Sequence, residues 1–159
     1  MSKKVVSNLV VEGAKTTYRN FAGVKKLYNN EGERNFNLIL DAEIAERLKA
    51  DGWNVKYQEP RDEDGEGRYL LEVKVSFSGI PPRVFAVTES RGMTALDANT
   101  VGMLDWARFK NIDLVVGPYN WEVDGSTGIT AYLRSLYATI EEDEFAVKYK
   151  DVPMAAQEG

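Results

Sequence analysis

Aromatic and basic side chains occur together in short clusters along this chain, most densely near its amino end. Three such clusters fall within 19 residues: Tyr18-Arg19-Asn20-Phe21, Lys25-Lys26-Leu27-Tyr28 and Arg34-Asn35-Phe36. A flat ring can stack on a nucleobase, and lysine or arginine can contact the phosphates that follow the bases. This mixture therefore indicates chemistry suited to a single-stranded nucleic acid.

The same mixture recurs later in the chain. Trp53, Lys56 and Tyr57 form one group, and a second contains Tyr119, Trp121, Tyr132 and Arg134. Tyrosine tolerates partial exposure, so it is the better stacking candidate, whereas Phe21 and Phe36 suit the core at least as well. Trp53 follows a predicted helix end and is expected to pack against that helix. The predicted nucleic-acid contacts are Lys15, Arg19, Lys25, Lys26, Arg34 and Lys56 for phosphates, and Tyr18, Tyr28, Tyr57 and Tyr119 for bases.

The charge of the chain is unevenly distributed. The 159 residues carry a net charge of −5, of which residues 1–36 contribute +4 and the remaining residues −9. A basic front on an acidic protein is a candidate surface for a polyanion. The simpler alternative is a solvated, charged surface. The acidic run Glu141–Glu144 could repel DNA from one face or solvate the edge of a strand.

The chain contains no cysteine and no histidine. These two absences exclude a histidine-based hydrolase, zinc held by Cys or His ligands, iron–sulfur clusters and disulfides. Segment 12–17 lacks the first glycine of a phosphate-binding loop, and the acidic stretch Asp62–Glu66 lacks the closing glutamate of a calcium loop. We predict no catalytic residue, no metal site and no cofactor.

Strand patterns dominate the chain. Leu71, Val73, Val75 and Phe77 alternate with polar residues, and Phe36, Leu38 and Leu40 share one face at a period of two. Ile112–Trp121 and Ile129–Ile140 are expected to form a hairpin around the Asp124-Gly125 turn. One helix is predicted over Ala42–Ala50, with Asp41 as its N-cap and Gly52 as its left-handed C-cap.

These elements predict a mainly β protein: a single OB-like five-stranded barrel over residues 1–150, with one clear inserted helix and a second short helix from Asp97 toward Leu104. Residues 151–159 are expected to be a flexible tail. The apolar runs are too short to cross a membrane, and no signal peptide is predicted. We therefore expect a soluble intracellular protein.

Most of the chain resembles a family of small bacteriophage single-stranded-DNA-binding proteins with an OB-type barrel. The resemblance begins with residues 19–23 and 28–36 and continues through Asp51-Gly52-Trp53-Asn54-Val55-Lys56. It then includes Asp105-Trp106, Pro118-Tyr119-Asn120-Trp121 and residues 139–144. It implies non-catalytic, sequence-tolerant binding of single-stranded DNA during phage replication or recombination, in the cytoplasm of the infected bacterial host. Phage or host replication proteins and a second copy of the chain are expected as further partners.

Two alternatives stay open at this point. The first is a protein-interaction module that engages a host or phage enzyme, with the acidic charge mimicking DNA. The second is a metal-dependent nuclease that uses carboxylates. Many replication single-strand binders end in an acidic tail with a terminal aromatic residue. This chain departs from that pattern, because its acidic run is followed by Phe145-Ala146-Val147-Lys148-Tyr149-Lys150.

Overall fold

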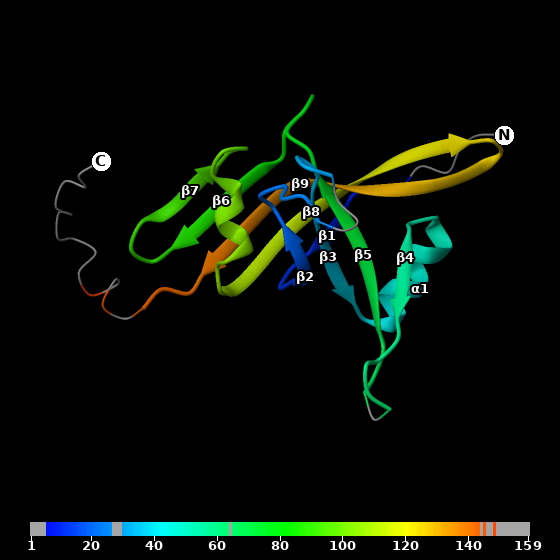
Figure 1. The fold of residues 1–159 in the computed structure, drawn as a ribbon, viewed down its shortest axis with the longest axis horizontal. Helices are drawn as coiled ribbons and strands as arrows, with labels where there is room; N and C mark the ends of the chain where they lie inside the picture. Colours follow the sequence, from blue (N-terminus) through cyan, green and yellow to red (C-terminus); the bar gives the residue numbers. More distant parts are fainter. Residues whose placement is uncertain (1–5, 27–29, 64, 144, 146–147, 149–159) are drawn as a thin grey trace.

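The computed structural model describes residues 6–26, 30–63, 65–143, 145 and 148. In this part of the chain nine strands form one sheet, accompanied by one α-helix and one 3-10 helix (Figure 1). The strands are β1 (Leu9–Val11), β2 (Lys15–Asn20), β3 (Arg34–Leu40), β4 (Val55–Gln58), β5 (Arg68–Val75), β6 (Arg83–Thr88), β7 (Gly92–Leu96), β8 (Phe109–Val123) and β9 (Ser126–Ile140). The helices are α1 (Ala42–Asp51) and η1 (Val101–Asp105).

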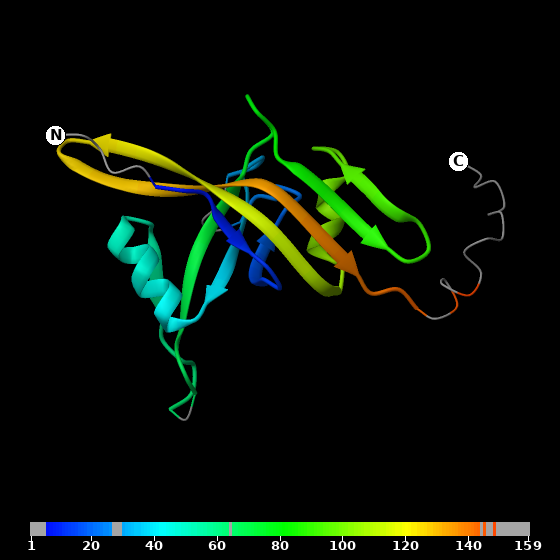
Figure 2. The ribbon, with the colours of Figure 1, turned by 180° about the vertical axis from the view of Figure 1, so that it is seen from behind.

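Strand β9 is the strand through which the two parts of the sheet are joined. One of its edges pairs with β8 along a hairpin that extends well past the neighbouring strands (Figures 1 and 2). Its other edge pairs in parallel with the end of β5 and then with β6. Strands β3 and β2 continue the sheet from one edge of β5, while β4 pairs with the other edge, which also meets β9. Strand β7 continues the sheet beyond β6.

The core lies on one face of this curved sheet. Alternate residues of each long strand point into it, including Phe36 and Leu38 of β3 and Leu71 and Val73 of β5. Phe21 stacks on Phe36 with their ring centroids 5.1 Å apart, so both phenylalanines serve the core. Helices α1 and η1 contribute further buried residues to the same core: Ala45 and Leu48 from α1, and Val101 and Leu104 from η1.

A β-bulge in β9 keeps the apolar side chains on the core side. Val116 pairs with Leu133 and Val115 pairs with Ser135, so Arg134 is the extra residue between them. Successive side chains of a regular strand point to opposite faces, so residues three positions apart, such as Leu133 and Leu136, would lie on opposite faces without this insertion. With it, both leucines are buried.

The local signals for α1 are confirmed. The Asp41 carboxylate accepts a hydrogen bond from the Ile44 N–H at 2.8 Å, and Gly52 ends the helix with a φ of 102°. The next residue, Trp53, is 3% exposed and belongs to the same core cluster as Ala45 and Leu48 of α1, the helix against which it was expected to pack. The predicted hairpin is also confirmed, and its strands are longer than the pattern indicated.

The fold is mainly β, as predicted, but the five-stranded barrel is not confirmed. The sheet has nine strands, and among the described residues β1 and β2 lie at opposite ends of the pairing order without closing it. The second short helix is the 3-10 helix η1. No helix in the described ranges is long and apolar enough to cross a membrane. The predicted tail at 151–159 lies outside the described residues.

The acidic run after β9 has a structural role through Glu142. Its carboxylate accepts hydrogen bonds from the backbone N–H of Ser90 at 3.0 Å and from the Ser90 hydroxyl. These bonds connect the end of β9 to the turn between β6 and β7. The hydroxyl bond, followed by the backbone bond, lowers the pKa of Glu142 from its ordinary value, and this outweighs the opposing effect of burial.

We predict that Glu142→Gln lowers the melting temperature at pH 7 and that this loss disappears in acid. Because the pKa of Glu142 is lower in the folded state, its stabilisation is present above the unfolded value of about 4.3 and is lost as the pH falls through the folded value. Thermal unfolding of both proteins between pH 7 and pH 3 checks this. A difference that stays constant over that range would contradict it.

Candidate nucleic-acid interface

The face of the sheet turned away from the core is built by rows of residues from several strands. In one row Asn35 of β3 lies opposite Lys74 of β5, Lys74 lies opposite Tyr132 of β9, and Tyr132 lies opposite Gly117 of β8. Their neighbours along each strand point into the core, so these residues point away from it. We call this surface the open face.

A second row places two predicted cations on the open face. Lys15 of β2 pairs with Ile39 of β3, which pairs with Leu70 of β5, which pairs with Lys56 of β4. Lys15 and Lys56 are both exposed. Leu70 is buried, but it is absent from the core cluster, which agrees with its place on the opposite side of the sheet.

The hairpin of β8 and β9 adds three aromatic side chains to the open face. Tyr119 and Trp121 are two positions apart on β8, so their side chains point to the same side of the hairpin. Tyr132 of β9 shares that side, because it pairs with Gly117, two positions before Tyr119. Tyr119 is 58% exposed and meets Tyr132 edge to face, with the ring centroids 6.0 Å apart. Trp121 is 36% exposed. These rings present π-surface to solvent at the spacing of a strand.

Two glycines make room for the large side chains on this hairpin. A Cβ atom at Gly117 would lie 2.3 Å from Nε of Arg134, and one at Gly128 would lie 2.5 Å from the indole ring of Trp121. Arg134 therefore lies across β8, and the Trp121 ring lies across β9. Close approach to backbone is the physical reason for glycine at both positions.

Strand β6 continues the same surface. Phe85 pairs with Tyr137 of β9, and their rings stack with centroids 5.0 Å apart. The guanidinium of Arg83 lies over the Phe85 ring, 5.8 Å from its centroid. Aromatic and cationic side chains thus follow one another along the open face: Trp121, Tyr119, Tyr132, Lys74, Arg134, Tyr137, Phe85 and Arg83.

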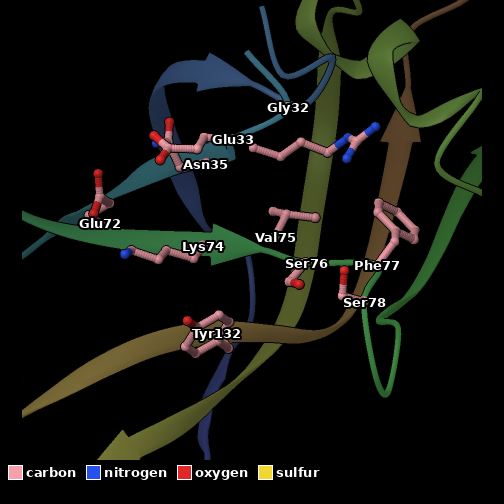
Figure 3. Close-up of a pocket in the computed structure, with 11 residues that line it drawn as sticks. Gly32, Glu33, Asn35, Glu72, Lys74, Val75, Ser76, Phe77, Ser78 and Tyr132 are labelled. Atoms are coloured by element: carbon pink, nitrogen blue, oxygen red, sulfur yellow. The ribbon is translucent and has the colours of Figure 1, made fainter. Parts of the chain in front are cut away.

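A hollow of about 560 Å³ opens on this surface beside Tyr132. Figure 3 shows Lys74 and Tyr132 on neighbouring strands, with Glu72 next to Lys74 on β5 and Glu33 and Asn35 on the other side of Lys74. The remaining lining residues are Gly32, Arg34, Val75, Ser76, Phe77 and Ser78. Among the described residues the Lys74 ammonium has no hydrogen-bond or ion-pair partner, so it can meet a phosphate.

The structure brings together only part of the predicted site. Lys15, Lys56 and Tyr119 share the open face. Arg34 lines the hollow, but its guanidinium donates to the carbonyl oxygen of Ala98 at 3.2 Å and lies over Phe77. Its Nε is buried without a hydrogen-bond partner among the described atoms. The Arg34 guanidinium is therefore partly engaged in contacts within the protein.

The predicted tyrosines 18 and 57 have different surroundings. The Tyr18 hydroxyl accepts hydrogen bonds from Nε2 of Gln58 at 2.7 Å and from Arg68 at 3.4 Å. These bonds, that from Gln58 first, lower the pKa of Tyr18. Tyr57 is 51% exposed but stands on the core-facing side of the sheet, where it packs edge to face on Tyr69. Tyr57 does not share a face with Tyr119.

Lys25 and Lys26 are exposed in the connection between β2 and β3, and Tyr28 lies outside the described residues. Arg19 is half-buried, and its NH1 group donates to the carbonyl oxygens of Leu104 at 2.8 Å and Ala107 at 2.9 Å. Its guanidinium also lies over the Phe109 ring, 4.6 Å from the centroid. In this arrangement Arg19 fixes the segment between η1 and β8.

Several open-face residues were not among the predicted contacts. The sequence pattern already grouped Tyr132, Trp121 and Arg134 with Tyr119, whereas Lys74, Arg83, Phe85 and Tyr137 were missed. Lys74 had a usable signal, because it alternates with the apolar residues of the clearest strand and must point away from the core. Phe85 and Tyr137 had none, since their pairing joins strands that are distant in sequence.

We predict that Arg19→Ala lowers the free energy of unfolding by about 1–3 kcal/mol, because two backbone carbonyls lose a charged donor. Chemical denaturation checks this, with Lys25→Ala as the matched control. Lys25 is exposed, so its removal should change the free energy of unfolding by less than about 0.5 kcal/mol. Equal stability of the two variants would contradict the structural role of Arg19.

Comparison with known proteins supports both the fold and the family. The fold is similar to that of the single-stranded DNA-binding protein from bacteriophage Enc34 in complex with ssDNA, with a TM-score of 0.56, 13% identity, and coverage of 87% of this chain and 89% of that chain. A second structure of the Enc34 protein gives a TM-score of 0.54 at 14% identity, covering 87% of this chain and 83% of that chain. No curated protein matches the chain in sequence.

The family described as "Putative phage ssDNA-binding domain" matches residues 1–158, which is nearly the whole chain. This match confirms the family that the sequence motifs resemble. The chain belongs to this family of phage ssDNA-binding domains.

Proposed function

We propose that the protein binds single-stranded DNA through the open face, without strong dependence on sequence over most of the bound strand. The observation that carries this proposal is the alternation of exposed or half-buried rings with cations on one face of β5, β6, β8 and β9. Membership of the phage family supports the same ligand.

The side chains divide the work between bases and phosphates. Tyr119, Trp121 and Tyr132 offer ring faces on which successive bases stack, and each stacked base contributes about 1–3 kcal/mol. Lys74 and Arg134 lie beside these rings and provide charges for the phosphates. Stacking accepts every base because each has a π-face, so this part of the surface is sequence-tolerant.

The negative net charge of the protein is compatible with this function. The open face carries Lys15, Lys56, Lys74, Arg83 and Arg134, so its local charge is opposite to that of the whole chain. An acidic mimic of DNA would instead need an excess of carboxylates over cations on its binding face. The cations therefore favour DNA binding over the mimicry alternative.

The proposed role follows from binding alone. A protein that covers exposed single strands would serve phage replication or recombination in the cytoplasm of the host, and it would meet replication proteins there. Stacking and phosphate contact require no catalytic group and no cofactor. Among the described residues, no group of three or more acidic side chains could hold a metal ion. A homodimer is a further proposal.

We predict that Tyr132→Ala weakens binding to oligo-dT by about 5- to 150-fold, the equivalent of one stacked base. Lys74→Ala should weaken binding less at high salt than at low salt, reducing the salt slope by about 0.7 for one lost phosphate contact. Fluorescence anisotropy at several salt concentrations measures both effects.

Tyr57→Ala is the matched control, because it removes an exposed tyrosine from the core-facing side of the sheet. Its affinity should stay within about twofold of the unaltered protein. If the protein fails to bind oligo-dT at low salt, the proposed function is wrong. If Tyr57→Ala weakens binding as much as Tyr132→Ala, the open face is not the interface.

A further inference from the structure

Among the described residues, two strand carboxylates on the open face, those of Asp113 and Glu72, have different surroundings. Asp113 of β8 is half-buried, and its Oδ1 accepts a hydrogen bond from the backbone N–H of Gly13 at 3.0 Å. Glu72 of β5 is exposed, and its side chain has no hydrogen-bond or ion-pair partner among the described residues. The charge of Glu72 is therefore available to a ligand.

Glu72 lies at the hollow. It precedes Lys74 by two residues on β5 and so points to the same side of the sheet. Figure 3 shows Glu72 and Lys74 next to each other on β5, with Tyr132 on the adjoining strand. A second carboxylate, Glu33, lines the hollow from the other side, but its oxygens accept from the backbone and side-chain nitrogens of Asn30.

A free carboxylate is unfavourable on a surface that attracts phosphates, since like charges repel. It becomes favourable where it accepts a hydrogen bond from a base. In DNA recognition, carboxylates accept from the exocyclic amino group of cytosine, and the corresponding atom of thymine is a carbonyl oxygen that offers no hydrogen. Tyr132, Lys74 and Glu72 line one hollow, so it offers a ring for stacking, a cation for a phosphate and an acceptor for the amino group of a base.

We propose that the hollow holds a single base of the bound strand, and that Glu72 accepts a hydrogen bond from its exocyclic amino group. Tyr132 stacks on this base, and Lys74 contacts the adjacent phosphate. The protein then prefers cytosine to thymine at one position while tolerating any base elsewhere. This inference rests on the proposed function, because it concerns one position of the same DNA surface.

The test compares three oligonucleotides by fluorescence anisotropy: all-dT, dT with one central dC, and dT with one central dU. The dU oligonucleotide lacks the thymine methyl but keeps the carbonyl, so it separates the amino group from the methyl group. The expected result is about tenfold tighter binding of the dC oligonucleotide than of the other two. Glu72→Gln should bind all three within about twofold, because an amide donates to a carbonyl as well as accepting from an amine.

Glu33→Gln is the matched control, since its carboxylate is engaged by Asn30, and it should retain the preference for dC. Tight binding of all-dT without any preference for dC would overturn this inference and leave the proposed function intact. A preference that survives in Glu72→Gln would also overturn it. No binding of any oligonucleotide would overturn the proposed function itself and this inference with it.

Discussion

The rest of the structure depends on one constraint: strand β9 pairs along both of its edges and must also bury its apolar side chains in the core. Its amino-terminal half lies between β8 and β5, and its carboxyl-terminal half lies between β8 and β6. Both halves face one core, through Leu133 in the first and Leu136 in the second. These leucines are separated by three positions, which a regular strand would place on opposite faces. The bulge at Arg134 corrects the alternation, so the whole sheet can share a single core.

The same bulge shapes the surface on the other side of the sheet. Because both halves of β9 turn their apolar residues inward, Tyr132 and Tyr137 both turn outward, together with the extra residue Arg134. Gly117 leaves the space over β8 into which Arg134 extends. One packing requirement thus produces both a buried core and a surface where rings and cations alternate. The packing of the core therefore determines which side chains of β9 point outward, where a ligand can contact them.

Local signals in the sequence predicted the elements that depend only on neighbouring residues. The cap at Asp41 and the left-handed Gly52 defined α1, and Asp124-Gly125 defined the long hairpin. The predicted barrel of five strands was not confirmed, because strand number and closure depend on pairings such as those of β6 with β9. For the same reason, residues that are close in sequence do not necessarily act together in the site. Arg19 and Tyr18 are adjacent in sequence, yet Arg19 bonds carbonyls near η1 and Tyr18 bonds Gln58 and Arg68.

Several carboxylates of this acidic chain have structural roles. Asp41 caps α1, Asp105 accepts from the backbone N–H groups of Phe21 and Ala22, and Glu142 accepts from Ser90. Backbone donors in turns and at helix ends need such acceptors, so these carboxylates hold connections in place. The cations of the open face, among them Lys74, are not neutralised by these groups. Net charge therefore says little about which polyanion a protein can bind, whereas the placement of each charge on the sheet decides it.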